Sequence, residues 1–345
     1  DPLELDLNTL YACVTGTSKH IGTSFTVREN VKPALDMLYR VAGGEANFRA
    51  RPFVSSSSPF VVSPMKFAED ACGVLEECVR GGIPILLLTT GQAGTAAPAP
   101  ALGAMVQAVA EVLAGLVYVN ALKPGHPALF GTWPFMSDPH TGAMAGGSAE
   151  QALLTAACAQ MAQFYDLPGA SAAGMSDSKL PDIQSGYEKG TTNVMAGLSG
   201  LDLVYEAAGM HASLLGFCLE SLIVDNDMLG HCQRCVRGID AGEAALSADA
   251  IAEVCLKGPG HYLGSGQAPR TVAADQFYPA IGERLTPREW CEKGKPDLLQ
   301  KAVAEKKRIL AERFPRHVSK AIDDRLRTRF GDLIKLPRSA MGWRS

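Results

Sequence analysis

The sequence carries no excess of positive charge. Its 32 Lys and Arg residues are outnumbered by 36 Asp and Glu, which gives a formal net charge of −4. Proteins that bind nucleic acid use basic side chains to neutralise phosphates, so this balance argues against a nucleic-acid partner. Basic residues gather only at 306–330, where acidic residues are interleaved among them as on solvent-exposed helices.

Signatures of membranes, nucleotides and metals are also missing. We find no uninterrupted apolar stretch of membrane-spanning length, and the best candidate, 115–125, is broken by polar residues and Pro124. No GxGxxG fingerprint follows a predicted strand, which disfavours an open nucleotide-binding sheet. A single CxxC, formed by Cys232 and Cys235, lacks a second ligand pair and lies in a helical pattern. The sequence therefore predicts no metal bound directly by this chain.

Cysteine usage points to a reducing compartment. The nine cysteines are scattered rather than arranged as a disulfide framework. Most of them lie within apolar helical patterns, as buried thiols do: Cys13, Cys72, Cys78, Cys158, Cys218 and Cys255. No signal-peptide pattern is present. These observations predict a cytoplasmic protein.

Strand-like and helix-like segments alternate along most of the chain. Short apolar runs rich in β-formers occur at 20–25, 53–57, 83–90, 128–133, 170–175, 202–208 and, more weakly, 261–265. Segments of helical period lie between them, at 27–44, 64–82, 101–119 and 148–167, the second with Pro64 in its first turn. Continuously apolar strands separated by helices predict a parallel sheet that is buried on both faces.

The predicted fold class is a (β/α)8 TIM-type barrel. Seven strands are visible where a closed barrel needs eight, so one is hidden or precedes Asp1. The pattern changes near Gln267 to a short segment followed by a long charged helix. We therefore predict a barrel domain at 1–266 and a C-terminal helical extension at 267–345 that packs on the barrel.

Polar residues cluster directly after the predicted strands. Four serines at 55–58 lie at the end of one strand, Gln92 follows the next, and the stretch 174–190 (GMSDSKLPDIQSGYEKG) is the most crowded. Barrel enzymes build their active sites from the loops at the carboxyl ends of the strands. This distribution predicts an enzyme with its site on that rim.

Each candidate also has a purely structural interpretation. The serines at 55–58 are equally consistent with a turn, and Trp133 with core packing. His211 can cap a loop, and a lysine such as Lys179 among Asp and Ser is more typical of a surface group than of a Schiff base. Glu206 ends an apolar strand, where a buried carboxylate is costly unless it is paired, so its burial would imply either a function or a partner.

Several segments resemble the trimethylamine methyltransferase family of corrinoid-dependent (β/α)8 barrels. The resemblance covers nearly the whole chain and is most specific at 169–211. It is carried by SAAGM and SDSKLPDIQSGYEKG (171–190), YEAAGMHASL (205–214) and, more loosely, FYPAIGERLTPREWCEKG (277–294). Family members carry a long further N-terminal segment, whose absence here would account for the missing strand.

The resemblance also implies a substrate class. The founding members contain pyrrolysine and demethylate trimethylamine, whereas relatives without pyrrolysine act on quaternary amines such as glycine betaine. This chain has only standard residues and reads SDSKLPD in the candidate loop, which argues against trimethylamine. The implied reaction moves a methyl group from glycine betaine or a related betaine to the Co(I) of a corrinoid. The resemblance implies that the corrinoid is carried by a separate protein partner, and this sequence shows no DxHxxG pattern of its own.

The chemistry of that reaction suggests roles for the polar and aromatic residues. A quaternary ammonium has no N–H donor and is held by aromatic faces, while a betaine carboxylate needs hydrogen-bond donors. For substrate binding we expect Trp133, Phe130, Tyr187, Tyr205, Gln184, Ser57, Thr90 and Gln92. As catalytic residues we expect Asp177, Glu206 and His211, and as corrinoid-facing residues Ser176, Lys179 and Asp182.

Two other classes of function remain open at this level. One is a different barrel enzyme, such as a lyase that forms a Schiff base through Lys179. The other is a betaine-binding protein without catalysis. Homo-oligomerisation is compatible with all three interpretations.

Overall fold

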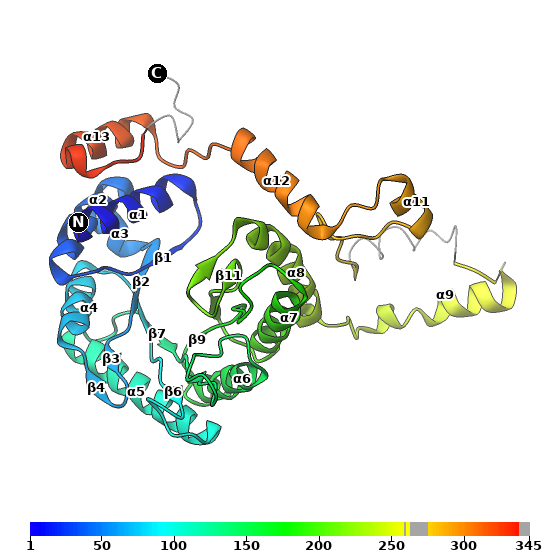
Figure 1. Cartoon of the computed structure of the whole chain (residues 1–345), viewed down its shortest axis with the longest axis horizontal. Helices are drawn as coiled ribbons and strands as arrows, with labels where there is room; N and C mark the ends of the chain where they lie inside the picture. Colours follow the sequence, from blue (N-terminus) through cyan, green and yellow to red (C-terminus); the bar gives the residue numbers. More distant parts are fainter. Residues whose placement is uncertain (259, 263–274, 338–345) are drawn as a thin grey trace.

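The centre of the molecule is a six-stranded, entirely parallel sheet. The computed structural model describes residues 1–258, 260–262 and 275–337. The strand order is β1-β2-β5-β7-β9-β10, and the sheet curls into part of a barrel with helices outside it (Figure 1). The strands are β1 (Ile21–Thr23), β2 (Val54–Ser58), β5 (Ile85–Leu87), β7 (Ala128–Gly131), β9 (Gly169–Ala172) and β10 (Leu203–Tyr205).

Helices follow the strands in the order that the alternating pattern predicts. They are α1 (Pro2–Gly16), α2 (Arg28–Ala42), α3 (Glu45–Ala50), α4 (Glu69–Gly81), α5 (Ala101–Leu122), α6 (Ala149–Phe164), α7 (Ile183–Leu198) and α8 (Leu219–Arg237). Ser148 caps α6 by accepting a hydrogen bond from the Gln151 amide at 3.2 Å. Asp182 caps α7 in the same way through the Ser185 amide at 2.9 Å. Side-chain acceptors at these positions satisfy amides that have no partner within the helix.

The loops at the carboxyl ends of the strands contain short paired segments. β3 (Val61–Val62) pairs antiparallel with β4 (Lys66–Phe67), and β11 (Met210–His211) pairs antiparallel with β12 (Gly216–Phe217). β6 (Gln92–Ala93) pairs parallel with β8 (Phe135–Met136). The β3–β4 hairpin corrects one prediction, because Pro64 lies in its turn and α4 begins only at Glu69.

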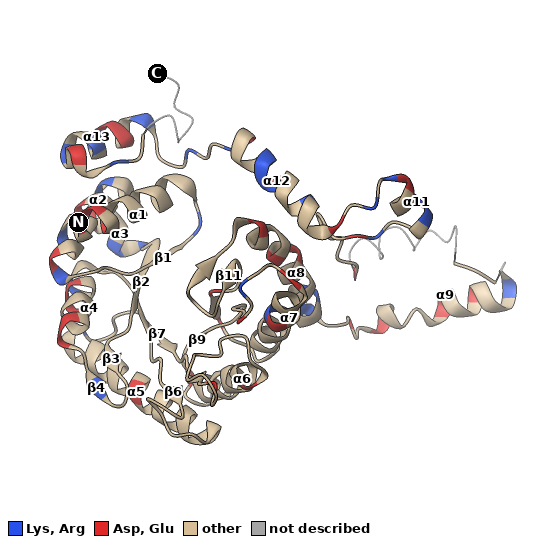
Figure 2. Cartoon of the chain, viewed as in Figure 1, with Lys and Arg blue, Asp and Glu red and all other residues tan. Residues whose placement is uncertain are grey.

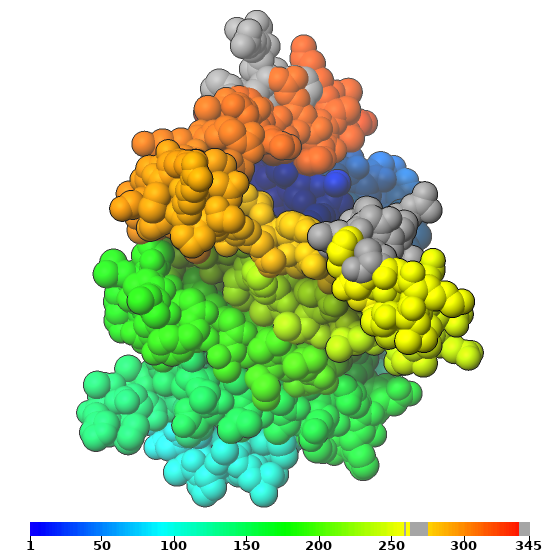
Figure 3. All heavy atoms as spheres, turned by 90° about the vertical axis from the view of Figure 1, so that its right-hand side faces the viewer, coloured from blue at the N-terminus to red at the C-terminus, as the bar shows by residue number. Residues whose placement is uncertain are grey.

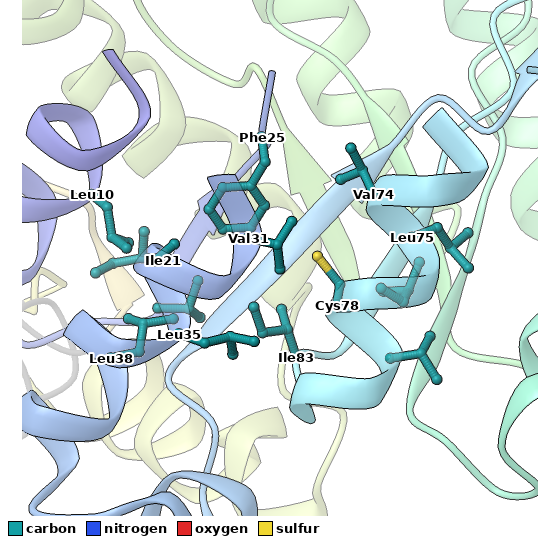
Figure 4. Packing of buried hydrophobic residues seen from close by; sticks show 14 of the residues in the cluster. Leu10, Ile21, Phe25, Val31, Leu35, Leu38, Val74, Leu75, Cys78 and Ile83 are labelled. Atoms are coloured by element: carbon teal, nitrogen blue, oxygen red, sulfur yellow. The ribbon is translucent and has the colours of Figure 1, made fainter. Parts of the chain in front are cut away.

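The strands β2, β5 and β9 are buried almost throughout, which explains their runs without exposed side chains. The main core lies between the convex face and the helices, where Val31, Leu35, Leu75 and Cys78 pack together (Figure 4). On the concave face, Leu86 and Leu88 of the β5 region pack against Ala170 of β9.

The closed eight-stranded barrel is not formed by the described residues. Six of the seven predicted strands are confirmed, at β1, β2, β5, β7, β9 and β10. The weak seventh, 261–265, is not confirmed: residues 261 and 262 belong to no strand, and 263–265 lie outside the described residues. Within the described chain, β1 and β10 each pair on one side only, so the sheet is a curled partial barrel.

The C-terminal segment links the two ends of this curled sheet. It contains α11 (Pro287–Glu292), α12 (Leu298–Glu312), α13 (Lys320–Phe330) and the short helix η3 (Gly331–Leu333). α12 packs against α8, whereas α13 packs against α2 and η3 against α1. Figure 3 shows this segment in orange, between the green helices and the blue N-terminal part. The predicted domain boundary at 266/267 lies outside the described residues.

One helix modifies the prediction about membrane spans. α5 is long and apolar enough to cross a membrane by length and composition alone, with a mean hydropathy of 1.8 in its best window. Its single charged residue, Glu111, is buried and accepts hydrogen bonds from Ser63 Oγ and the Met65 amide, both at 2.9 Å. α5 packs against β5, β7, α4 and α6 like the other outer helices, and Figure 2 shows it almost without charge.

Candidate functional site

A cavity of about 510 Å³ lies at the carboxyl ends of the strands, on the concave face of the sheet. Ser57, Leu88, Trp133, Tyr205 and Glu206 line it from the β2, β5, β7 and β10 regions, and Asp6 and Thr23 line it from α1 and β1. The Trp133 ring meets the Tyr205 ring edge to face, with centroids 5.3 Å apart. The site therefore combines aromatic, hydroxyl and carboxylate groups from five strands.

Strand alternation decides which residues reach this cavity. Successive side chains of a strand point to opposite faces, so Ser57 lies on the concave face and Ser56 on the helix-covered face. On the β7 segment, Trp133 faces the cavity, but Phe130, three residues earlier, points outward. The Phe130 ring lies 6.3 Å from that of Tyr165 at the end of α6. Phe130 is therefore part of the outer core, which corrects its predicted place in a substrate cage.

Glu206 is a partly buried carboxylate in a strained position. Burial raises the pKa of its carboxyl group above the ordinary 4.5. It adopts a positive φ of 58°, which is unfavourable for a residue with a β-carbon. Within the described part of the chain, its side chain makes no hydrogen bond or ion pair. A free carboxylate beside aromatic rings is suited to a cationic ligand.

Two buried donors beside the cavity are also unsatisfied. Among the described residues, the Trp133 Nε1–H and the Tyr205 hydroxyl have no hydrogen-bond partner. Burial raises the pKa of the Tyr205 hydroxyl, so it stays protonated and able to donate. Unsatisfied buried donors are rare, and they indicate a site where a ligand or water completes the bonding.

The crowded stretch 174–190 connects the loops around the cavity. Asp177 Oδ1 accepts hydrogen bonds from the Gly146 amide at 2.9 Å and from Ser213 Oγ at 2.6 Å. Glu188 Oε2 accepts from Ser176 Oγ at 2.6 Å and from the Asp177 amide at 2.9 Å. These bonds join the loops after β7, β9 and β10. They give Asp177 and Ser176 a scaffolding role that sequence reasoning did not foresee.

The other predicted residues of this stretch lie away from the cavity lining. Gln184 Nε2 donates to Glu188 Oε1 at 2.8 Å, and Lys179 Nζ donates to the Asp177 carbonyl at 2.7 Å. Tyr187 is 60% exposed on α7. Asp182 is the cap of that helix, where hydrogen bonds from the Ser185 amide and the Ser178 hydroxyl lower the pKa of its carboxyl.

A buried charged cluster lies behind the loop after β10. Lys189 Nζ pairs with Asp225 Oδ2 at 2.7 Å, and both side chains are buried. His211 Nε2 lies 2.6 Å from Ser221 Oγ and 3.4 Å from Lys189 Nζ. Burial, reinforced by the Lys189 charge, lowers the pKa of His211, so its ring is neutral at pH 7. His211, predicted as a catalytic residue, does not line the cavity.

Sequence reasoning missed Lys189, Asp225 and Glu188. One signal was available, because Ser185, Lys189 and Thr192 follow one another at helical spacing and form one face of α7. A lysine among small residues on a buried face needs an acidic partner. The partner, Asp225, comes from α8 and could not be identified without the packing of the two helices.

Thr90 and Gln92 follow β5 without lining the cavity. Gln92 belongs to β6, and its Oε1 accepts a hydrogen bond from Ser137 Oγ at 3.0 Å. Of the predicted site residues, the structure thus brings four together around the cavity: Ser57, Trp133, Tyr205 and Glu206.

The CxxC pair lies on α8, as its helical pattern predicts. Cys232 is buried and Cys235 is exposed, so the two thiols face different environments. Across residues 1–258, 260–262 and 275–337, no group of three or more His, Cys, Asp or Glu is arranged to hold a metal ion.

The chain is similar in sequence to known proteins of one family. A family model described as trimethylamine methyltransferase (MTTB) matches residues 3–332. The trimethylamine methyltransferase MttB of Methanosarcina thermophila is 31% identical over 318 residues, which are 92% of this chain and 64% of that protein. The glycine betaine methyltransferase of Desulfitobacterium hafniense (strain Y51) is 29% identical over 321 residues, 93% of this chain and 66% of that protein. The chain thus spans just under two thirds of the length of both relatives.

Proposed function

Because this chain belongs to the trimethylamine methyltransferase family, we propose that it transfers a methyl group from a quaternary amine to a corrinoid carried by a separate protein. The observation that carries the proposal is the cavity in which Trp133 and Tyr205 stand beside the unpaired carboxylate of Glu206. This combination suits a cation that cannot donate hydrogen bonds.

Glycine betaine or a related betaine is the substrate that this cavity favours. The faces of Trp133 and Tyr205 would attract the trimethylammonium head, with about 0.5–2 kcal/mol for each desolvated contact. Glu206 would balance its charge. The hydroxyls of Ser57 and Thr23, on the neighbouring strands β2 and β1, would donate hydrogen bonds to the carboxylate.

The role of this chain in the reaction is to position the substrate and exclude water. The corrinoid supplies a Co(I) nucleophile whose electron pair forms the new bond to the methyl carbon. The electrons of the broken C–N bond stay on nitrogen, and the leaving amine is neutral. No general acid is therefore required for this reaction. Among the described residues that line the cavity, Glu206 is the one carboxyl group without a hydrogen bond or ion pair.

The corrinoid partner would approach the rim beside α7 and the β11–β12 hairpin. Large apolar side chains are exposed there, namely Leu180, Ile183, Tyr187, Leu215 and Phe217. The hairpin is fixed to the 176–178 loop by the Ala212 amide, which donates to the Ser178 carbonyl at 2.9 Å. Lys179 and Tyr187 can take part in such an interface. Ser176 is fully buried and therefore cannot face a partner protein directly.

An assay with free Co(I) cobalamin tests the proposal without a natural partner. Glycine betaine should methylate the corrinoid, as followed by its absorbance, while trimethylamine should not. Trimethylamine is mostly protonated at neutral pH, and its free base lacks the positive charge that makes the amine a good leaving group. Turnover of trimethylamine, or none of any quaternary amine despite a folded protein, would contradict the proposal.

The two alternatives make different predictions in the same experiment. A Schiff-base lyase would be trapped as a covalent adduct by borohydride, but Lys179 lies outside the cavity lining and its ammonium is hydrogen-bonded to a carbonyl. A binding protein without catalysis would retain glycine betaine in calorimetry and leave the corrinoid unmethylated.

A further inference from the structure

A second cavity, of about 650 Å³, lies at the opposite rim of the sheet. It is formed by the amino ends of β1 and β2, where Ile21 and Phe53 lie, and by residues near the ends of α1 and α2. This region is in the upper left of Figure 1, where α1, α2, α3 and β1 meet. The sequence predicts strands but no functional residue in this region, and the proposed methyl transfer does not use the cavity.

The charge of this cavity is one-sided. Lys19 and Arg51 line it together with His20 and His317, and no Asp or Glu does; burial lowers the pKa of His20, so the positive charge comes from Lys19 and Arg51. These four residues come from the α1–β1 loop, from the segment before β2 and from the segment between α12 and α13. Among the described residues, neither Lys19 nor Arg51 forms an ion pair. In a protein with a net charge of −4, such a convergence of basic groups favours an anion.

Helix capping does not account for these basic groups. Lys and Arg often balance the carbonyls at helix C-termini, and α1 and α2 both end near this cavity. Several of those carbonyls already have other donors, and among the described residues neither the Lys19 nor the Arg51 side chain bonds one of them. The Gly44 amide bonds the Tyr39 carbonyl at 2.7 Å, Asn47 Nδ2 bonds that of Ala42 at 3.1 Å, and the His317 amide bonds that of Thr15 at 3.1 Å. Lys19 and Arg51 therefore remain free for a ligand.

The walls of the cavity narrow the class of ligand. Val14, Val41, Pro52 and Phe53 provide apolar and aromatic surface next to the basic side chains. A ligand with an apolar or planar body and a phosphate group would fit both parts, because guanidinium and ammonium groups bind phosphate oxygens through charge-assisted hydrogen bonds. We propose that this cavity binds a phosphomonoester of nucleotide size at the rim opposite the methyl-transfer site.

Calorimetry on the whole chain tests this site with three probes. Adenosine monophosphate should bind, adenosine should bind at least about tenfold more weakly because it lacks the charge-assisted bonds, and inorganic phosphate should bind more weakly because it lacks the apolar contacts. Adenosine binding as tightly as its monophosphate would overturn the anionic site. Inorganic phosphate binding as tightly would overturn the role of the apolar walls.

A charge-matched pair of variants separates a local site from general electrostatics. The double variant Lys19→Gln/Arg51→Gln should lose about tenfold or more in affinity for adenosine monophosphate. The control Lys66→Gln/Lys123→Gln removes the same charge from exposed residues elsewhere and should leave the affinity within about twofold. Equal losses in the two pairs, or no binding to the parent protein at millimolar ligand, would overturn the proposal. Glycine betaine affinity, measured in parallel, should stay unchanged in both pairs.

Discussion

At the residue scale, the alternation of side chains along a strand decides which residues line the cavity and which pack in the outer core. Trp133 and Phe130 lie three residues apart on the β7 segment, so they point to opposite faces of the sheet. Trp133 lines the concave cavity, while Phe130 packs against Tyr165 of the outer layer. The two aromatic residues looked equivalent in the sequence, but we expect their substitution to have different consequences.

Replacing Trp133 by Ala should weaken the binding of glycine betaine. The loss of one aromatic wall should cost about 1–2 kcal/mol, a five- to thirty-fold loss of affinity by calorimetry. Phe130→Leu is the matched control from the same strand. It should reduce stability by about 1 kcal/mol and leave the affinity unchanged. An unchanged affinity in Trp133→Ala would place the cation elsewhere.

Replacing Glu206 by Gln should stabilise the fold and weaken cation binding. Because burial raises its pKa, the native state holds this proton at higher pH than the unfolded chain does. Its contribution to stability is therefore full below the ordinary pKa of 4.5 and is lost as the pH rises through the raised value. The Glu206→Gln side chain does not ionise, so the variant avoids this loss of stability at neutral pH. Solvent screening limits its gain in unfolding free energy to less than about 1 kcal/mol.

The pH dependence of binding provides the second half of this test. A bound quaternary ammonium favours ionised Glu206, so affinity should rise with pH through the raised pKa in the parent protein and stay flat in Glu206→Gln. Denaturation and calorimetry at several pH values measure both effects. Glu150→Gln, on the exposed surface of α6, serves as control. A variant that is less stable at neutral pH would show that Glu206 has a structural partner.

At the scale of elements, α7 is held by charge as well as by packing. Lys189 reaches Asp225 of α8, and Asp225 Oδ2 also accepts from the Gly209 amide at 2.7 Å, in the loop after β10. One buried carboxylate thus joins two helices and a loop at the carboxyl rim. The helix that begins after the crowded stretch is thereby fixed relative to the cavity.

Lys189→Met should destabilise the protein strongly. The substitution leaves Asp225 buried without its cation, which costs about 3–5 kcal/mol in urea unfolding. Adding Asp225→Asn removes the uncompensated charge and keeps an acceptor for the Gly209 amide, so the double variant should recover more than half of the loss. Arg80→Met, which removes the two ion pairs of an exposed α4 arginine with Glu76 and Glu77, should change stability little. Equal effects of Lys189→Met and Arg80→Met would contradict a buried pair.

At the scale of the whole molecule, the C-terminal segment connects the two ends of a sheet that the described residues do not close. α13 is anchored to α1 by a buried network in which the Tyr11 hydroxyl donates to Asp323 and accepts from Arg327 Nη2. Asp323 has no solvent-exposed surface, so its buried carboxylate needs these neighbours as hydrogen-bond and ion-pair partners.

Tyr11→Phe should loosen this anchor. Asp323 would lose a donor while remaining buried, at a cost of about 1–3 kcal/mol in unfolding free energy. Proteolysis should cut between α12 and α13 faster in the variant. Tyr165→Phe, which removes an exposed hydroxyl, should behave like the parent protein in both measurements. Unchanged cleavage in Tyr11→Phe would mean that other contacts hold α13.

The order of elements was determined by the sequence itself. Apolar strand segments and helical periods are local patterns, and they predicted seven strands, six of which are confirmed, together with their parallel direction and the rim on which polar residues gather. Family membership followed from motifs that are contiguous in the chain. The sequence also predicted a closed barrel, which the described residues do not form, because the pairing of β1 and β10 with further strands depends on contacts distant in sequence.

Only the tertiary structure decided which polar residues belong to the cavity. Ser57, Trp133, Tyr205 and Glu206 come from three separate strand regions and meet because the sheet curls. The sequence predicted Asp177 and His211 as catalytic residues in the same way as Glu206. In the structure, however, Asp177 bonds the loop after β7 and His211 joins the Lys189 cluster. A side chain's partners depend on the packing of segments far apart in the chain, and residue type and spacing contain no information about that packing.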